Sequence, residues 1–178
     1  MDYEFFHSLT TAEARTYLER FLKVEKSAVE AMRSVAAIDG VNLDYSLVYL
    51  ADAMKWMVKQ VKMVRIPVPE EEPSWIRQAH PHGLAEFDDD SKATVMRAAY
   101  YLGECFARLS GMRWTTGNAE YLYKNMPVIA GFRRDEELPP LVVVDNMFAR
   151  IVADGGPISK INSTIQTWLL ECPEAPDK

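Results

Sequence analysis

The sequence predicts a mainly helical α+β fold that forms a single domain over residues 1–178. Apolar residues recur at helical spacing through about residues 1–110, and the period shortens to that of strands over about residues 111–172, where helices close the chain. No repeat or composition shift separates the two parts. With 178 residues and a hydrophobic fraction of 48%, the chain is large enough to bury a core of its own.

Three helices dominate the first part. The first begins at a capping box, Thr10 to Glu13, and ends at Gly40. The second begins near Asp44 and continues to Val64, and its apolar residues lie on most faces, which is typical of a central helix. The third spans about residues 91–109 and ends at Gly111.

The segment 66–90 is predicted as a long loop. Its three prolines between positions 66 and 73 favour extended backbone. One helical turn is expected over residues 74–79, with Trp75 against the core. Long loops inside compact domains are often functional or mobile.

The C-terminal half is predicted to hold a small antiparallel sheet. Strands are expected at 112–116, 127–132 and 141–144, and residues 118–125 fit either a turn or a strand. Asp145 is expected to cap a short helix. Pro157 then takes the first position of the last helix, whose apolar residues run to Leu169.

Charge and composition exclude several classes of function. The net charge of −6 disfavours a nucleic-acid partner, because phosphate binding needs a basic surface, and would steer the protein toward a basic one. No apolar run reaches the length of a membrane span, and residues 1–7 lack the features of a signal peptide. Cys105 and Cys172 fit no metal or redox spacing, so two reduced thiols and a cytoplasmic location are expected, and a disulfide between the two is the less favoured alternative.

The cluster most similar to a metal site joins two histidines to a run of aspartates. His80 and His82 flank a proline shortly before Asp88, Asp89 and Asp90. No third ligand is fixed by the spacing, so an exposed proline turn without metal is favoured. One of the three aspartates is expected to cap the helix that follows, which leaves the others exposed as a contact patch.

Glu104 is the polar group inside the most apolar helix. It could act as a general acid or base, but no second catalytic group is evident near it. Arg108 lies four residues on, so an ordinary helix ion pair explains it, and a bond to Trp114 would link helix to sheet. Glu104, Arg108 and Trp114 are therefore expected to form a structural polar core, with no catalytic residue and no cofactor.

Several short stretches carry a resemblance to known proteins. They are the segment Tyr101-Leu-Gly-Glu104 followed by Trp114, and the ranges 9–14, 125–132 and 140–144. Together they resemble a core that recurs in small, mostly uncharacterised bacterial proteins, some of which are immunity or accessory proteins of toxin systems. The resemblance implies an immunity role and brings no assigned catalytic residues.

The leading hypothesis is a non-enzymatic bacterial protein that binds another protein, such as a basic toxin domain, and neutralises it. Acidic loops would steer the two together and aromatic residues would anchor them. The alternatives are an enzyme or small-ligand binder with a pocket near Glu104 and Trp114, or a homo-oligomeric structural protein, so the oligomeric state stays open. The candidate contact residues are Glu70, Glu71, Glu72, Trp75, Phe87, Asp88, Asp89 and Asp90.

Overall fold

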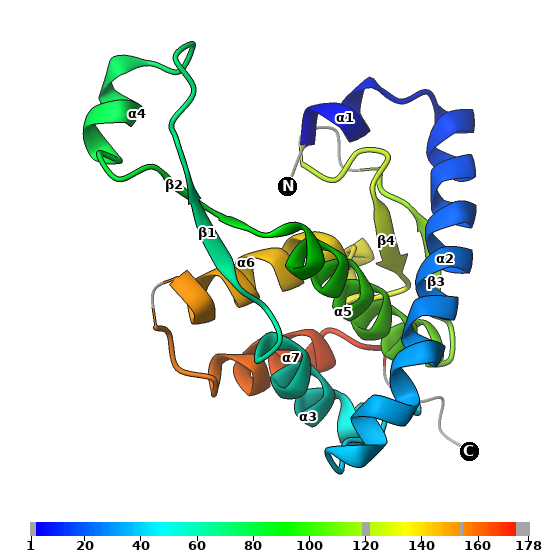
Figure 1. The fold of residues 1–178 in the computed structure, drawn as a ribbon. Helices are drawn as coiled ribbons and strands as arrows, with labels where there is room; N and C mark the ends of the chain where they lie inside the picture. The colour runs from blue at the N-terminus through cyan, green and yellow to red at the C-terminus, as the bar shows by residue number, and fades with distance from the viewer. Residues whose placement is uncertain (1–2, 119–121, 154, 174–178) are drawn as a thin grey trace.

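The computed structural model describes residues 3–118, 122–153 and 155–173, and it confirms a mainly helical α+β fold (Figure 1). Within these residues, two separate two-stranded antiparallel sheets accompany the helices. In chain order the elements are α1 (Tyr3–Ser8), α2 (Thr11–Ile38), α3 (Leu47–Val58), β1 (Met63–Ile66), α4 (Ser74–Ala79), β2 (Leu84–Phe87), α5 (Asp89–Ala107), β3 (Arg113–Thr116), β4 (Pro127–Ala130), the 3₁₀ turn η1 (Arg133–Asp135), α6 (Pro140–Ala153) and α7 (Lys160–Leu170).

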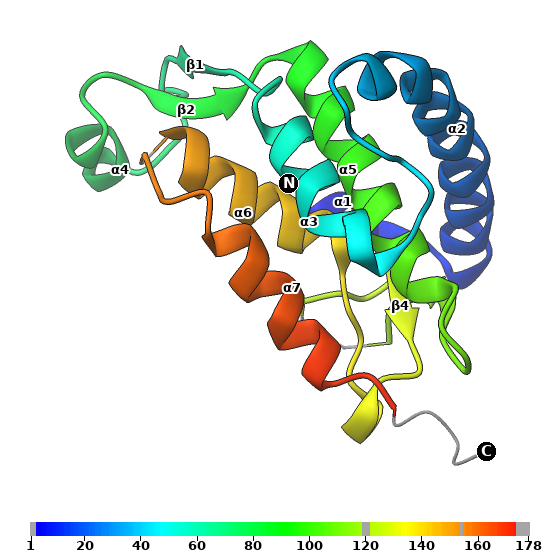
Figure 2. The same cartoon turned by 90° about the horizontal axis from the view of Figure 1, so that it is seen from below.

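Helix α5 is the centre of the fold. It packs against α2, α3 and α6 and also touches both strands of the β3–β4 sheet, and Figure 2 shows it lying between α2 and α6. Tyr101, Leu102 and Phe106 of α5 are among the largest fully buried side chains. The apolar residues of this helix therefore hold the surrounding elements together.

Helix α2, the first helix that the sequence predicted, begins at the predicted capping box. The Thr10 hydroxyl accepts a hydrogen bond from the Glu13 N–H, and the Glu13 carboxylate accepts one from the Thr10 N–H at 2.8 Å. This reciprocal capping box satisfies two N–H groups that the helix itself leaves free. The short helix α1 that precedes it was not predicted.

The second predicted helix is shorter than expected. Ser46, within the predicted start at residues 44–46, is the N-cap of α3, but the helix already ends at Val58. Val61 remains buried, but Met63–Ile66 forms strand β1 instead of a last helical turn. A run of four residues is too short for its apolar spacing to distinguish a helix from a strand. The sequence pattern therefore could not show that the predicted last turn of the helix is strand β1.

The segment predicted as a loop forms a β-hairpin together with the three residues before it. Strand β1 pairs with β2 in antiparallel register, from Met63 opposite Phe87 to Ile66 opposite Leu84. Helix α4 lies between the strands, at the position of the predicted helical turn. Gly83 allows the return into β2: its φ is +85°, and a Cβ there would fall 2.2 Å from the Ile66 carbonyl oxygen.

The C-terminal sheet has two strands, where three were predicted. β3 and β4 pair from Arg113 opposite Ala130 to Thr116 opposite Pro127, which confirms those two. Of the ambiguous segment 118–125, residues 119–121 lie outside the described residues; the isolated bridge between Gly117 and Lys124 flanks the sheet.

The predicted strand 141–144 is wrong, because these residues belong to helix α6. Pro140 occupies the first position of the helix, where its missing N–H costs nothing. Leu141, Val144 and Phe148 are all nearly completely buried, so packing of a helical face against α5 outweighs the strand preference of three consecutive valines. Asp145 consequently lies within the helix and does not cap it.

The last helix begins later than predicted. α7 starts at Lys160 rather than at Pro157, and Ile161 and Ile165 face the core. In the described ranges, no helix is both long enough and apolar enough to cross a membrane.

Candidate functional site

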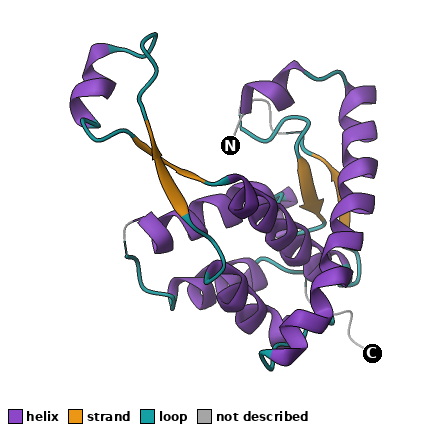
Figure 3. Cartoon of the chain, viewed as in Figure 1, coloured by secondary structure: helices purple, strands orange, loops and turns teal. Residues whose placement is uncertain are grey.

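The β1–β2 hairpin and α4 form an arm that stands away from the rest of the molecule (Figure 3). We call residues 63–87 the arm. Its two strands form a narrow ribbon, and α4 lies at the far end of it, while the base of the ribbon contacts α5 and α6. A two-stranded ribbon without a third strand has little core of its own and leaves its outer strand edges unpaired.

The tip of the arm is acidic and carries one large exposed aromatic side chain. Trp75 is 68% exposed, which corrects the expectation that it packs against the core. Glu70 and Glu71 are exposed, and Glu72 is half-buried. Tryptophan is enriched among the residues that anchor protein–protein interfaces, so an exposed indole on an acidic segment is a candidate contact residue.

Arg77 fixes the loop that carries these glutamates. Its guanidinium donates hydrogen bonds to the backbone carbonyls of Glu70 and Glu72, the latter at 2.7 Å. Because the guanidinium binds carbonyl oxygens, it orders the loop without forming an ion pair with the glutamate side chains.

At the base of the arm, one predicted contact residue is buried and one of the three aspartates forms the predicted helix cap. Phe87 is only 7% exposed, so it belongs to the core and offers no surface anchor. Asp88 caps α5: its Oδ1 accepts the Ser91 N–H at 2.8 Å. Interaction with Ser91, first through its side chain and then through this N–H, holds the pKa of the Asp88 carboxyl below its usual value. Asp89 and Asp90 are exposed, and Asp89 pairs with Lys92 at 3.3 Å.

The two histidines of the arm are exposed. His80 and His82 lie at a shallow surface together with Arg65 and Arg77. Within the described residues, no three His, Cys, Asp or Glu side chains gather closely enough to hold a metal ion.

Glu104 joins α5 to the β3–β4 sheet. One carboxylate oxygen accepts a hydrogen bond from Arg108 Nε at 3.0 Å and the other accepts one from Trp114 Nε1 at 3.3 Å. The structure thus brings the predicted polar core of Glu104, Arg108 and Trp114 together. With both oxygens engaged, the carboxylate is placed for a structural role.

Aromatic rings surround this link. The Trp114 indole stacks on Tyr100 at 6.3 Å between centroids and meets the edge of Phe21 at 5.7 Å. Burial is the main cause that raises the pKa of Tyr100, followed by the nearby Glu104 charge. Neutral, buried phenols of this kind serve packing better than proton transfer.

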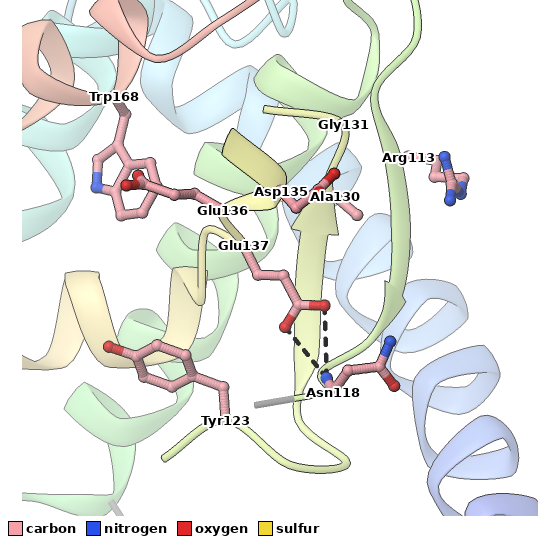
Figure 4. A pocket seen from close by; sticks show the side chains of 9 residues that line it. All are labelled: Arg113, Asn118, Tyr123, Ala130, Gly131, Asp135, Glu136, Glu137 and Trp168. Carbon is pink, nitrogen blue, oxygen red and sulfur yellow. Dashed lines mark hydrogen bonds between the residues drawn. The ribbon is translucent and has the colours of Figure 1, made fainter. Parts of the chain in front are cut away.

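A hollow that the sequence did not indicate runs along the β3–β4 sheet (Figure 4). It has a volume of about 830 Å³. Asp135, Glu136 and Glu137 lie along it, and Glu137 accepts the Asn118 N–H at 3.1 Å. Figure 4 shows the Trp168 indole beside Glu136, with Tyr123 below Glu137.

The hollow is assembled from residues that are distant in sequence. Trp168 comes from α7, the carboxylates from the segment at η1, and Tyr123 from the stretch before β4. The acidic–basic run 133–137 was visible in the sequence as a connection between strands. Its proximity to Trp168 is set by tertiary packing and had no sequence signal.

Searches of protein-family models, of curated proteins and of solved structures find no match to this chain.

Proposed function

We propose that this chain is a non-enzymatic protein-binding protein whose arm docks onto a basic surface of another protein. The observation that carries the proposal is the exposed Trp75 at the end of a ribbon that projects from the body, beside the exposed carboxylates of Glu70 and Glu71. Aromatic side chains that are buried at the centre of an interface contribute most of its free energy. Charges around them mainly raise the rate of association.

The shape of the arm supports the same use. A ribbon that extends from the body can reach into a concave surface of a partner, and its free strand edges can pair with an extended segment there. Because the ribbon has no third strand to support it, contact with a partner would also stabilise it.

The more specific form of the proposal is that the partner is a toxin, which the protein neutralises by occluding it. The acidic net charge of −6 favours a basic target, and the resemblance of residues 101–104 and Trp114 to proteins of toxin systems points to the same class. The competing possibility of a catalytic pocket at Glu104 is weakened by the two hydrogen bonds that engage its carboxylate.

Capture from a lysate of the native host tests the interaction when arm variants are compared with matched controls. Wild type and Ile38→Ala, which shortens another exposed apolar side chain, should retain one stoichiometric partner. Trp75→Ala should lose it, with an expected cost of at least about 2 kcal/mol in binding free energy. Equal retention by Trp75→Ala and Ile38→Ala would show that the arm is not the contact surface.

The captured protein then tests the charge and toxin parts separately. Neutralising Glu70, Glu71 and Glu72 to glutamine should slow association at low salt and leave dissociation nearly unchanged, while Glu19→Gln, an exposed control on α2, should change neither. Expression of the partner alone should arrest growth, and co-expression of the wild-type chain should restore it. A partner that is harmless when expressed alone would remove the toxin assignment but not the binding one.

A further inference from the structure

A second hollow lies beside the C-terminal half of α2, on a different part of the molecule from the arm. It has a volume of about 610 Å³ and includes three basic side chains in a chain that is acidic overall. We call it the arginine hollow. Its lining residues are Lys26, Glu30, Arg33, Ala37, Val41, Asn42, Leu43, Asp44 and Arg108.

The two arginines that line it are held against one buried tyrosine. The Cζ atom of Arg33 lies 5.2 Å from the centroid of the Tyr45 ring, and that of Arg108 lies 4.2 Å from the same centroid. Arg33 comes from α2 and Arg108 from the end of α5, helices that pack side by side. A planar guanidinium resting on an aromatic ring is restrained before any ligand arrives.

The position of Tyr45 is unusual for a bulky residue. Its ring is buried, and its backbone φ is +63°, in the left-handed region that side chains of this size rarely adopt. A hydrogen bond from its N–H to the Tyr101 hydroxyl, at 3.3 Å, holds it there. Strain of this kind persists where the surrounding structure maintains it, and it is concentrated at functional sites.

The basic groups retain hydrogen-bond donors for a ligand. Arg108 donates a hydrogen bond to Glu104 through Nε. Its two Nη groups donate no hydrogen bond to any residue in the described part of the chain. Arg33 uses Nη1 for Glu30 at 2.9 Å. Lys26 makes no ion pair with any described residue. Two guanidinium forks and an ammonium group are a donor set that fits a carboxylate or a phosphate.

The two carboxylates of the hollow are already engaged. Glu30 accepts the Tyr45 hydroxyl as well as Arg33. Asp44 accepts one hydrogen bond from Asn42 Nδ2 at 3.0 Å and another from the Ser46 N–H at 2.8 Å. These bonds reduce, without removing, the repulsion that an anion would meet.

We propose that the arginine hollow binds an oxyanion, a carboxylate or phosphate group, between Arg33 and Arg108. Tyr45 positions the two guanidinium groups, and Lys26 adds charge at the rim. The site is independent of the arm and of the proposed partner, since it carries the opposite charge and lies on other elements.

Nuclear magnetic resonance of the arginine side chains tests this site directly. The probes are pyrophosphate and succinate, added at constant ionic strength with chloride as the balancing anion. We expect saturable shifts of the Nε–H signals of Arg33 and Arg108 at concentrations up to about 20 mM. The probe that binds more tightly identifies the ligand as phosphate-bearing or carboxylate-bearing.

Variants with opposite expected signs separate a site from general charge effects. Arg33→Gln should weaken binding about tenfold, since it removes one fork, whereas Arg20→Gln, an exposed arginine on the same helix, should leave it unchanged. Glu30→Gln should strengthen binding, because it frees Arg33 and removes a repelling charge. Both variants alter exposed side chains, so each is expected to fold, and circular dichroism checks this.

Three results would overturn the proposal. The first is the absence of saturable shifts in the wild type. The second is an equal loss of affinity in Arg33→Gln and Arg20→Gln, which would mean that only net charge matters. The third is unchanged or weaker binding by Glu30→Gln, because the model of the site requires that carboxylate to compete with the ligand.

Discussion

At the scale of single residues, Gly103 shows how closely α5 and the sheet approach each other. It lies one position before Glu104, and a Cβ on it would fall 2.2 Å from Cη2 of Trp114 and 3.0 Å from Cγ of Pro140. The absence of a side chain therefore lets the indole lie on the helix, where Glu104 can bind its N–H. The glycine contributes a close approach that no other residue type permits.

Gly103→Ala should destabilise the protein by about 1–3 kcal/mol through overpacking, although alanine is the better helix former. In a Trp114→Leu background the same change should cost clearly less, because the atoms that clash are those of the indole. Urea unfolding of the four proteins of this cycle measures the coupling. Ser110→Ala, at an exposed position nearby, should be close to neutral.

The two cysteines differ in burial, and both are free thiols. Burial raises the pKa of the Cys105 thiol, which is 1% exposed, and it also raises that of the half-buried Cys172. Since the thiolate is the reactive form, the native protein should react slowly with iodoacetamide, and Cys172 should react before Cys105.

Mass spectrometry of partly alkylated protein measures this order. Unfolding in guanidinium should make the two sites equally reactive, and Cys172→Ser provides a chain with Cys105 alone. A Cys105 that reacts in the native state as fast as in guanidinium would contradict its buried position.

At the scale of elements, sequence and structure agree best at the capped starts of α2 and α5. Thr10 with Glu13 and Asp88 with Ser91 form caps that are local in sequence, so a short pattern contains all that is needed to form them. The prediction of helix or strand fails where burial against the rest of the molecule decides between them. The valines before Asp145 favour a strand, yet they form part of α6, because a helical face is what packs against α5.

The cap at Asp88 should give the protein a measurable pH dependence. The pKa of its carboxyl is lowered in the folded state by Ser91, first through its side chain and then through its N–H, so the charged cap stabilises α5 above the unfolded pKa of about 4. As pH falls through the folded pKa, that contribution is lost.

Thermal unfolding of Asp88→Ala and wild type measures this effect. The variant should melt lower at pH 7, and the difference should shrink as pH is lowered below about 4. Asp90→Ala, a neighbouring exposed aspartate, should show a smaller difference at pH 7. If the difference in melting temperature between Asp88→Ala and wild type did not change with pH, the charge of the cap would contribute nothing to stability.

At the scale of the whole molecule, the arm and the body depend on different interactions. The core cluster extends from Phe6 to Ile165 and includes Phe87 at the base of the arm, but no residue between 63 and 86 is part of its buried set. The arm should therefore open at a lower free energy than α5 does, and its amides should exchange faster with solvent.

Replacing residues 67–82 by a short glycine-containing turn should leave the body folded. The expected change in melting temperature is within about 3 °C, because few buried contacts are removed. Phe106→Ala, which opens a cavity in the core, should instead cost about 3–5 kcal/mol. Loss of cooperative unfolding in the trimmed protein would show that the arm supports the body.

Some residues of the candidate contact surface could be recognised from the sequence, and for others the fold decides whether they are exposed. Exposed side chains at Glu70 and Glu71 could be proposed from the sequence because three prolines and a run of charge mark their segment as solvated, whereas Trp75 was expected against the core and is exposed. Phe87 lies only a few residues further and is buried at the foot of the ribbon. Whether an aromatic residue in such a segment faces solvent depends on the pairing of β1 with β2. The sequence predicted a loop there and gave no sign of this hairpin.

The sequence by itself determined the helical class, the capped starts of α2 and α5, and the ion pair four residues apart between Glu104 and Arg108, because each depends on neighbours along the chain. Tertiary structure alone decided that residues 63–87 project as an arm and that Arg33 and Arg108, 75 positions apart, both lie against the ring of Tyr45. Such arrangements depend on which faces the elements bury against one another, and that choice is made by the core as a whole.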